Sequence, residues 1–244
     1  MYVVAYVVIY FLVIYRLKTE KILITKEQVV DVLTWSVLGL AIGARLFYVI
    51  FYDPSYYVIH PLEIILPFHN GQLVGFSGLS YHGGLIGIIL ALWMCCSSKK
   101  LKLWTVGDLF IPCIPLGYFF GRLGNFINGE LYGRATTVPW AMIFPSDPQG
   151  LLRHPSQLYE AGLEGLVLFM VLWSLRKKIH GPRMLALYLA GYALARIFVE
   201  QFRQPDPQLG FIFGSLTMGQ LLSTGMIIVA IWLWFMKVKD TKNV

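Results

Sequence analysis

Seven apolar runs divide this chain and constrain its fold more than any other feature of the sequence. They lie at residues 1–15, 29–52, 79–97, 107–127, 157–175, 184–202 and 216–236. Each of the last six approaches the ~20 residues that a helix needs to cross a bilayer. Hydrophobic residues make up 57% of the chain and charged residues 14%, more apolar surface than a soluble domain buries. The sequence therefore predicts an all-α polytopic membrane protein, a single integral-membrane domain over residues 1–244 with seven transmembrane helices.

The first run is shorter than the others. About fifteen helical residues rise about 22 Å, less than the ~30 Å of a hydrocarbon core. The run does not read as a signal peptide, because no positive charge precedes it and no small-residue cleavage site follows it. We therefore expect the first helix to be truncated, with its start upstream of Met1.

The basic residues are distributed unevenly between the two sides of such a bundle. Fourteen of the 20 Lys and Arg residues, among them every lysine, fall in the first, third and fifth loops and the tail. They are Arg16, Lys18, Lys21, Lys26, Lys99, Lys100, Lys102, Arg176, Lys177, Lys178, Arg183, Lys237, Lys239 and Lys242. By the positive-inside rule this predicts a periplasmic N-terminus and a cytoplasmic C-terminus. The net charge of +7 is thus a topology signal, and a nucleic-acid partner is not expected.

The other six basic residues are all arginines. Arg45, Arg122 and Arg196 lie inside apolar runs or at their ends, and Arg134, Arg153 and Arg203 lie in outer loops. A charge within a membrane is costly unless a partner or ligand needs it. The planar guanidinium fork suits phosphate. A carboxylate partner would explain any one of these arginines, whereas several biased to one leaflet favour an anionic ligand.

Two outer segments contain prolines that exclude a continuous helix. They are residues 53–78 and residues 128–156. Within the second, Val138–Phe144 is a candidate short strand. We expect residues 128–156 to form a small periplasmic head, too small to be an independent domain. No internal repeat is evident, which weakens a transporter built from repeated halves.

Glycines and cysteines in the apolar runs have structural interpretations. The glycine pairs Gly39/Gly43, Gly83/Gly87 and Gly117/Gly121 have a four-residue spacing that lets helix backbones approach closely. Cys95, Cys96 and Cys113 lie within or at the ends of apolar runs, and their spacing indicates neither a metal site nor a disulfide. No acidic cluster indicates a metal site either.

A polar stretch at the end of the fourth run carries unusual chemistry. Residues 121–133 contain an arginine, two amides, a carboxylate and four glycines. Arg122 and Asn125 are expected to share a helix face, and Asn128 lies one step further along. Glu130 is placed to orient Arg122 or to cap local backbone. Glycines here let backbone come close to a ligand.

His82 is the only histidine within an apolar run. It lies in residues 78–84, at the outer end of the third run, and Gly83 and Gly84 follow it. A hydrogen bond between helices would explain a histidine there. Histidine also accepts a proton near neutral pH, so a base facing a glycine-lined cleft is the sharper hypothesis.

Residues 154–160 introduce the fifth run with further polar groups. Ser156 is a candidate N-cap. Tyr159 and Glu160 would lie in the first helical turn, where a carboxylate suits the helix dipole. Capping and catalysis are both open for this stretch.

The sixth run ends in a stretch of alternating charge, residues 195–206. Arg196 and Glu200 are four residues apart and share a helix face, so a simple ion pair would explain them. Arg203 lies seven residues from Arg196, on the same expected face. Two arginines flanking one glutamate would leave net positive charge to hold an anion.

Five stretches together resemble bacterial prolipoprotein diacylglyceryl transferases. They are Gly43–Tyr48 and residues 78–84, 121–133, 154–160 and 195–206, and in this order they cover nearly the whole chain. The resemblance implies an enzyme of the bacterial inner membrane with its site open to the outer leaflet. Such an enzyme transfers the diacylglyceryl group of phosphatidylglycerol to the lipobox cysteine thiol of a prolipoprotein signal peptide. A thioether forms and glycerol 1-phosphate leaves, the first step of lipoprotein maturation.

The resemblance also implies roles for individual residues. His82, Arg122 and Arg196 match the essential histidine and arginines, which we take as catalytic. Other sensitive positions are matched by Asn125, Glu130, Gly133 and Glu200. With Arg122, Asn128 and Arg203, these form the expected substrate-binding set. Asp108 also matches, but it opens the fourth run from the inner side, so we expect it to cap a helix.

The expected partners are phosphatidylglycerol, lipobox signal peptides and the lipid bilayer, with no cofactor and no metal. Family members carry a tyrosine-bearing outer turn before the position of Met1, so we expect either that translation begins earlier or that this member lacks that element. Two other functions fit part of the pattern. A lipid-phosphate transporter would place polar groups along the full depth of the bundle, and a membrane acyltransferase using His82 would not need two arginines.

Overall fold

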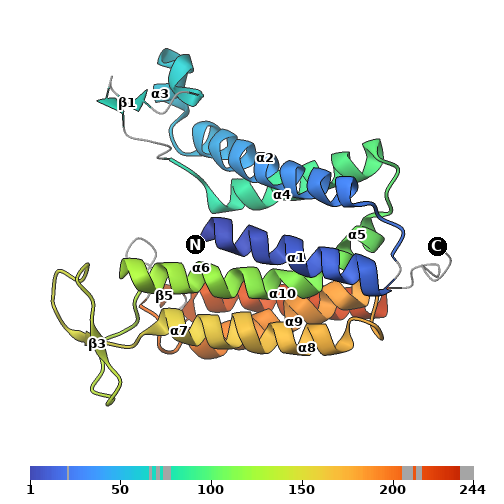
Figure 1. Cartoon of the computed structure of the whole chain (residues 1–244). Coiled ribbons are helices and arrows are strands. Elements are labelled where there is room, and N and C mark those ends of the chain that lie inside the picture. The colour runs from blue at the N-terminus through green and yellow to red at the C-terminus, as the bar shows by residue number, and fades with distance from the viewer. Residues whose placement is uncertain are drawn as a thin grey trace. The chain divides into compact units, whose positions relative to one another are not determined.

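The computed structural model describes residues 1–20, 22–65, 68–69, 72–73, 78–204, 211–212 and 216–236, and it is mainly helical (Figure 1). The chain forms two compact units. One consists of residues 24–103, and the other consists of residues 1–23 and 104–244. Each unit has its own packing.

Two long helices dominate the unit of residues 24–103. Between α2 (Lys26–Phe51) and α4 (Tyr81–Ser98) lie α3 (Pro54–Ile59), the 3-10 turn η1 (Pro61–Ile64) and a hairpin of β1 (Phe68–His69) and β2 (Gln72–Leu73). A reciprocal capping box between Thr25 and Gln28 starts α2. The two long helices run side by side (Figure 1).

Glycines bring α2 and α4 into close contact. A Cβ atom on Gly43 would lie 2.7 Å from Cα of Gly87, and one on Gly39 would lie 2.5 Å from Cβ of Ala91. On Gly83 it would lie 3.0 Å from Cγ of Phe47. Larger side chains would therefore force the helices apart. The predicted packing role of the pairs Gly39/Gly43 and Gly83/Gly87 is confirmed.

Arg45 of α2 holds the outer segment of this unit. Its Nε donates to the carbonyl oxygen of Ile64 at 2.9 Å, its Nη1 donates to that of Gly78 at 3.3 Å, and its Nη2 donates to that of Glu63. The guanidinium also lies over the ring of Tyr57. Arg45 therefore links α2 to the residues that follow it, which explains an arginine within this apolar run.

The other unit is a bundle with a small hairpin at one end. It contains α1 (Tyr2–Glu20), α5 (Leu103–Phe110), the 3-10 turn η2 (Ile111–Cys113), α6 (Ile114–Asn128), β3 (Met142–Ile143), β4 (Leu152–Arg153), α7 (Ser156–Glu160), the π-helix η3 (Ala161–Val167), α8 (Leu168–Leu175), α9 (Pro182–Val199), β5 (Phe211–Ile212), β6 (Leu216–Thr217) and α10 (Met218–Phe235). α9 packs along α10, and α6 packs against α1 and η3 (Figure 1).

Helices occupy the predicted apolar runs, although one helical stretch contains a 3-10 turn and another contains a π-helix. Within the described residues, five helical stretches are long and apolar enough to cross a membrane. They are Lys26–Phe51, Leu103–Asn128, Ser156–Leu175, Pro182–Val199 and Met218–Phe235. The second contains η2 and the third contains η3. These stretches agree with a polytopic all-α membrane protein.

The first helix is longer than predicted. α1 has 19 residues and ends at Glu20, so it rises about 28 Å. The prediction that helix covers only residues 1–15 is wrong, and Arg16 and Lys18 lie in α1 rather than in a loop. The reason is that the charged residues of this turn find partners inside the bundle.

Arg16 is the clearest case, since its side chain is 2% exposed. Its Nη1 donates to the carbonyl oxygens of Asp108 and Leu109 at 2.6 and 2.7 Å. Pro112 has no N–H, so the Asp108 carbonyl lacks its usual helical donor. Arg16 also pairs with Glu20 at 2.6 Å. The arginine thus satisfies backbone that the proline leaves open.

Asp108 does not cap its own helix. α5 begins at Leu103, so Asp108 lies beyond its first turn. Its carboxylate accepts the N–H of Gly181 at 2.6 Å, directly before α9. The prediction that Asp108 caps the helix of the fourth run is therefore wrong. Its carboxylate instead accepts a backbone N–H at the start of α9, the helix of the sixth run.

The predicted packing of Gly117 and Gly121 is half confirmed. A Cβ atom on Gly117 would lie 2.6 Å from Cδ1 of Ile9 in α1, so this glycine allows close approach. On Gly121 it would meet no described atom within 4 Å.

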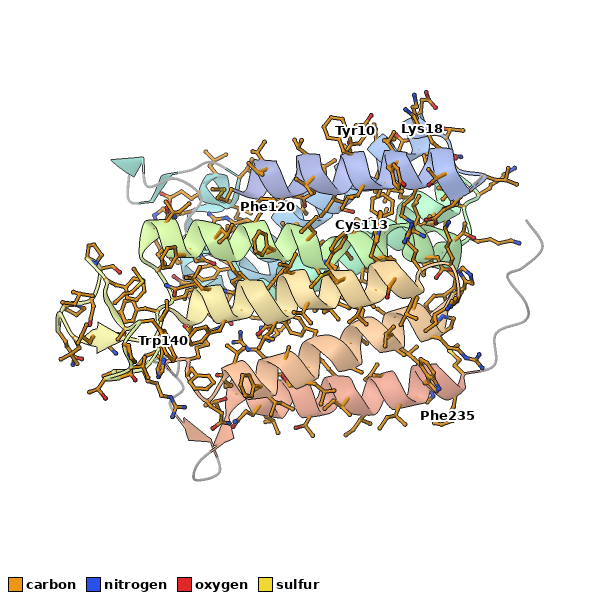
Figure 2. All side chains as sticks on the ribbon, turned by 60° about the horizontal axis from the view of Figure 1, so that its bottom comes forward. Tyr10, Lys18, Cys113, Phe120, Trp140 and Phe235 are labelled. Atoms are coloured by element: carbon orange, nitrogen blue, oxygen red, sulfur yellow. The ribbon has the colours of Figure 1, made fainter. Side chains whose placement is uncertain are left out.

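The hairpin of β3 and β4 forms part of the segment 128–156 that was expected to be a head. The strand expected over Val138–Phe144 is limited to Met142–Ile143, because residues before it form a turn closed by Ala141 and Val138. Figure 2 places Trp140 at one end of this unit and Lys18 and Phe235 at the opposite end. The lysine-bearing end of α1 is therefore remote from the hairpin.

An ion pair holds this segment together. Asp147 accepts hydrogen bonds from Nε and Nη2 of Arg153 at 2.6 and 3.1 Å. It also accepts the backbone N–H groups of Gln149 and Leu151. These bonds, the Arg153 side chain above all, lower the pKa of Asp147 from 3.8 to about 2. The carboxylate is therefore ionised throughout the physiological range.

Candidate active site

Arginines from two helices meet on one carboxylate. Arg122 of α6 and Arg196 of α9 each place a guanidinium nitrogen 2.9 Å from Oε2 of Glu160 at the end of α7. Nη1 of Arg203 lies 3.8 Å from the same oxygen. Glu160 is fully buried, so its charge depends on these partners.

Two further glutamates complete the cluster. Oε1 of Glu164, in η3, lies 3.8 Å from Nη1 of Arg196, and Oε2 of Glu200 lies 3.0 Å from its Nε. Three guanidinium groups therefore face three carboxylates. The net positive charge expected around Arg196 is not present in this arrangement, because Glu160 and Glu164 also face Arg196, and neither was predicted as its partner.

The hydroxyl of Tyr118 connects the cluster. It accepts a hydrogen bond from Nε of Arg122 at 2.7 Å and lies 2.6 Å from Oε2 of Glu164 and 3.1 Å from Oε2 of Glu160. A hydroxyl has one proton to donate, and the shorter distance assigns it to Glu164. Tyr118 thus links the arginine of α6 to the carboxylate of η3.

The π-helix carries Glu164 and directly follows Glu160. π-helical turns are rare and occur mostly at functional sites. Gly165 permits close contact with α6, since a Cβ atom there would lie 2.9 Å from Cα and 3.1 Å from N of Phe119. This contact fixes the distance between η3 and the helix that bears Tyr118 and Arg122.

A chain of amides and a carboxylate continues from Arg122 to the end of α6. Nη1 of Arg122 donates to Oδ1 of Asn125 at 3.4 Å, and the amide groups of Asn125 and Asn128 each donate to Glu130 at 3.4 Å. Glu130 therefore reaches Arg122 through Asn125 rather than directly. Gly129, in the left-handed conformation with φ of 71°, ends the helix and turns the chain toward Glu130.

Gly133 lies where the chain passes close to two other segments. Its N–H donates to the carbonyl of His154 at 2.9 Å, and its backbone pairs with that of Arg203. A Cβ atom on Gly133 would lie 2.8 Å from Cβ and O of His154. Arg203 lies beyond the end of α9 at Val199, so it does not share a helix face with Arg196 as expected. Its backbone is placed instead by the Gly133 segment.

Of the two alternatives left open for residues 154–160, capping is not what the structure has. Ser156 is not an N-cap, because Pro155 precedes α7 without a capping side chain and the Ser156 hydroxyl donates to the carbonyl of Leu131 at 3.2 Å. The Tyr159 hydroxyl accepts the indole N–H of Trp140 at 2.6 Å. Glu160 does not serve the helix dipole, because it pairs with the arginines.

His82 lies in the unit of residues 24–103, in the first turn of α4, and its side chain is exposed. The Ser80 hydroxyl caps this turn by accepting the N–H of Gly83 at 3.4 Å. Gly83 and Gly84 are buried against α2, at Phe47 and Leu40. These glycines therefore serve helix packing, and a glycine-lined cleft beside the imidazole stays a prediction. The role of His82 stays a prediction.

Within the described part of the chain, no group of three or more His, Cys, Asp or Glu side chains is arranged to hold a metal ion. Cys95, Cys96 and Cys113 are buried free thiols. The Cys113 thiol contacts the carbonyl oxygen of Leu109.

Comparison with known proteins decides the family. The family model for prolipoprotein diacylglyceryl transferase matches residues 1–236 of this chain. The chain belongs to the prolipoprotein diacylglyceryl transferase family. It is 49% identical to the phosphatidylglycerol–prolipoprotein diacylglyceryl transferase of Chlorobaculum tepidum over 236 residues, which is 95% of this chain and 82% of that protein. It is 45% identical to the enzyme of the same name from Legionella pneumophila strain Corby, over 97% of this chain and 90% of that protein.

This charged cluster contains groups that were not predicted from the sequence. Tyr118 and Glu164 were not predicted, and for Glu160 capping and catalysis were both left open. Spacing was the available signal, since Tyr118 lies four residues before Arg122 and Glu160 lies four before Glu164. Polar residues at that spacing in an apolar helix share one face, which in a membrane protein indicates a buried polar site.

Proposed function

We propose that this transferase moves the diacylglyceryl group of phosphatidylglycerol to the lipobox cysteine thiol of prolipoproteins. The observation that carries the proposal is the meeting of Arg122 and Arg196 on one oxygen of Glu160. Two guanidinium groups held at one point match a phosphate, whose oxygens accept bidentate hydrogen bonds. In the described part of the chain, no hydrogen bond uses Nη2 of either arginine, so both keep N–H donors for a ligand.

The reaction follows from this placement. The thiolate sulfur of the peptide attacks the glyceryl carbon, the bond from that carbon to the phosphate oxygen breaks, and its electron pair stays on the phosphate. The thiol proton passes to a base. Negative charge grows on the departing phosphate monoester, and preorganised donors in a water-poor site stabilise such charge strongly. The carboxylates hold the guanidinium groups in orientation before the substrate arrives.

Other residues take further roles in the proposed reaction. Asn125, Asn128, Glu130, Gly133, Glu200 and Arg203 contribute to substrate binding, and His82 accepts the thiol proton. Oε1 of Glu160 and Oε1 of Glu164 are buried, and neither accepts a hydrogen bond from a described residue. The hydroxyls of the glycerol headgroup are donors that suit such oxygens.

The proposed setting is the bacterial inner membrane, with seven transmembrane helices in one domain. The N-terminus and the head of residues 128–156 are periplasmic, and the C-terminus is cytoplasmic. Single cysteines at Ser55 and Thr137 should react with an impermeant maleimide in intact spheroplasts. One at Lys102 should react only after lysis. If only the cysteine at position 102 is labelled in intact spheroplasts, the orientation of the protein is the opposite of the one proposed.

The decisive experiment uses the purified chain in phosphatidylglycerol vesicles with a lipobox peptide. Mass analysis should find the peptide heavier by one diacylglyceryl group, with glycerol 1-phosphate released in equal amount. A peptide with serine in place of cysteine should be inert. Acylation without glycerol 1-phosphate would indicate an acyltransferase, and lipid movement without peptide modification would indicate a transporter. The variant His82→Gln tests the proton acceptor, and normal turnover would remove His82 from that role.

A further inference from the structure

The carboxylate of Glu200 lies against the first turn of α10. Glu200 follows the last residue of α9, it is buried, and its Oε2 lies 3.0 Å from Nε of Arg196. Gly219, the second residue of α10, also lies against this carboxylate. A Cβ atom on Gly219 would lie 2.8 Å from Cδ and Oε2 of Glu200 and 3.0 Å from Oε1. The space occupied by the carboxylate therefore depends on the missing side chain at position 219.

The first turn of α10 is held in place. The Thr217 hydroxyl accepts the N–H of Gln220 at 3.3 Å, and the Gln220 side chain accepts the N–H of Thr217 at 3.1 Å. The helix also packs along α9. A helix N-terminus carries partial positive charge, which favours a carboxylate beside it. The group that must give way to a larger residue at position 219 is thus the end of the Glu200 side chain.

We propose that Gly219 is a positioning residue for the diacylglyceryl transfer, because it seats Glu200 so that Glu200 orients Arg196. This inference rests on the proposed function of Arg196. A displaced Glu200 carboxylate would leave Nε of Arg196 without its partner while the helices stay in place. Misplacement of a reacting group by about 1 Å can cost on the order of 10²-fold in rate, so a small shift of Arg196 matters.

The chain offers a matched control on the same helix. A Cβ atom on Gly225 would meet no described atom within 4 Å, so Gly225→Ala tests the change in helix propensity alone. We expect Gly225→Ala to transfer at the wild-type rate. Gly219→Ala should lose about tenfold in kcat with little change in KM for the lipobox peptide, a partial misplacement on the scale above. Equal rates for the two variants would overturn the positioning role.

A second residue tests whether Gly219 acts through Glu200. Glu200→Asp draws the carboxylate back by one methylene, so it should lower turnover alone and remove the clash with alanine at position 219. The double variant, Gly219→Ala with Glu200→Asp, should be no slower in transfer than the slower of the two single variants. Losses that multiply would mean independent effects and would refute the inference.

The same cycle can be read without catalysis, from the thermal midpoint of the purified protein. Gly219→Ala should have a lower midpoint than Gly225→Ala, and Glu200→Asp should remove that difference. Additive midpoints would show that Gly219 does not seat Glu200. A wild-type chain that transfers nothing would refute the proposed function and the catalytic part of this inference, and the thermal cycle would still decide the seating of Glu200.

Discussion

Arg122 and Arg196 lie on different helices and contact the same atom, each at 2.9 Å from Oε2 of Glu160. Each guanidinium is therefore oriented by a carboxylate before any substrate binds. Preorganisation of this kind costs nothing at the moment of reaction, which is why it contributes strongly to catalysis. The consequences can be tested residue by residue.

Arg122→Lys and Arg196→Lys should each reduce transfer by about 10²-fold or more. Lysine keeps the charge, but it lacks the planar fork that contacts Glu160 and a phosphate together. Release of glycerol 1-phosphate in the presence of the lipobox peptide measures the loss. Arg183→Lys is the matched control, because Arg183 lies in the same helix as Arg196 with an exposed contact to Trp234.

The competing account is that Arg196 only neutralises Glu200. In that case Arg196→Gln combined with Glu200→Gln should recover activity, since a buried pair is replaced together more safely than it is broken. We expect the double variant to stay inactive. Transfer at the wild-type rate would exclude Arg196 from the mechanism.

Glu160→Gln should destabilise the protein and abolish transfer. The amide keeps the shape of the side chain, but Arg122 and Arg196 then face each other without the charge between them. Breaking a buried ion pair costs about 3–5 kcal/mol. Denaturant unfolding of the purified protein measures this, with the exposed Glu27→Gln as control. Equal stability and activity of the two variants would contradict the central role of Glu160.

Tyr118→Phe removes only the hydroxyl that lies between Arg122 and Glu164. A buried group that loses its partner costs about 1–3 kcal/mol, so the unfolding free energy should fall by that amount. Transfer should fall less than in Arg122→Lys, because Glu160 still holds Arg122. The control is Tyr10→Phe, where the described contact is with the ring of Phe11. A Tyr118→Phe protein that behaves like Tyr10→Phe would show that the hydroxyl is dispensable.

Gly165→Ala should lower both the thermal midpoint and the transfer rate. Its added Cβ would meet the backbone of Phe119, which has no flexible end to move away, so η3 must separate from α6. Gly162→Ala lies in the same π-helix, and its Cβ would meet no described atom within 4 Å. We expect that variant to resemble the wild type, and a similar loss in both would point to the π-helix itself.

The pairing of Asp147 with Arg153 predicts acid sensitivity of the hairpin segment. The folded-state pKa of Asp147 is lowered from 3.8 to about 2. The stabilisation that its ionised carboxylate contributes is therefore fully present above pH 3.8. It should disappear as the pH falls from 3.8 through about 2. The measurement is the difference in thermal midpoint between wild type and Asp147→Asn across this range. A difference that persists at the acid end would mean that the ion pair is not its source.

Many residues of the candidate site could be predicted from the sequence because they lie close together along the chain. Arg122 and the amides and glycines of residues 121–133 stand out in an apolar context, and Arg196 and Glu200 have helical spacing. For Glu160, the sequence left capping and catalysis both open. Its position at a helix start fits capping equally well, and only the packing of α7 between α6 and α9 brings it to both arginines.

By itself, the sequence determined the membrane character, the helical runs and the residue types of the candidate site, since hydrophobicity, spacing and charge are properties of the chain order. Only the tertiary structure decided which charges meet. Glu160 and Glu164 share one helical stretch, whereas Arg122 and Arg196 come from two other helices. Whether a buried charge faces a ligand or an internal partner therefore depends on distances between helices. The same reason explains Arg16, assigned to a loop by its charge and placed in α1, where it donates to the Asp108 carbonyl that Pro112 leaves open.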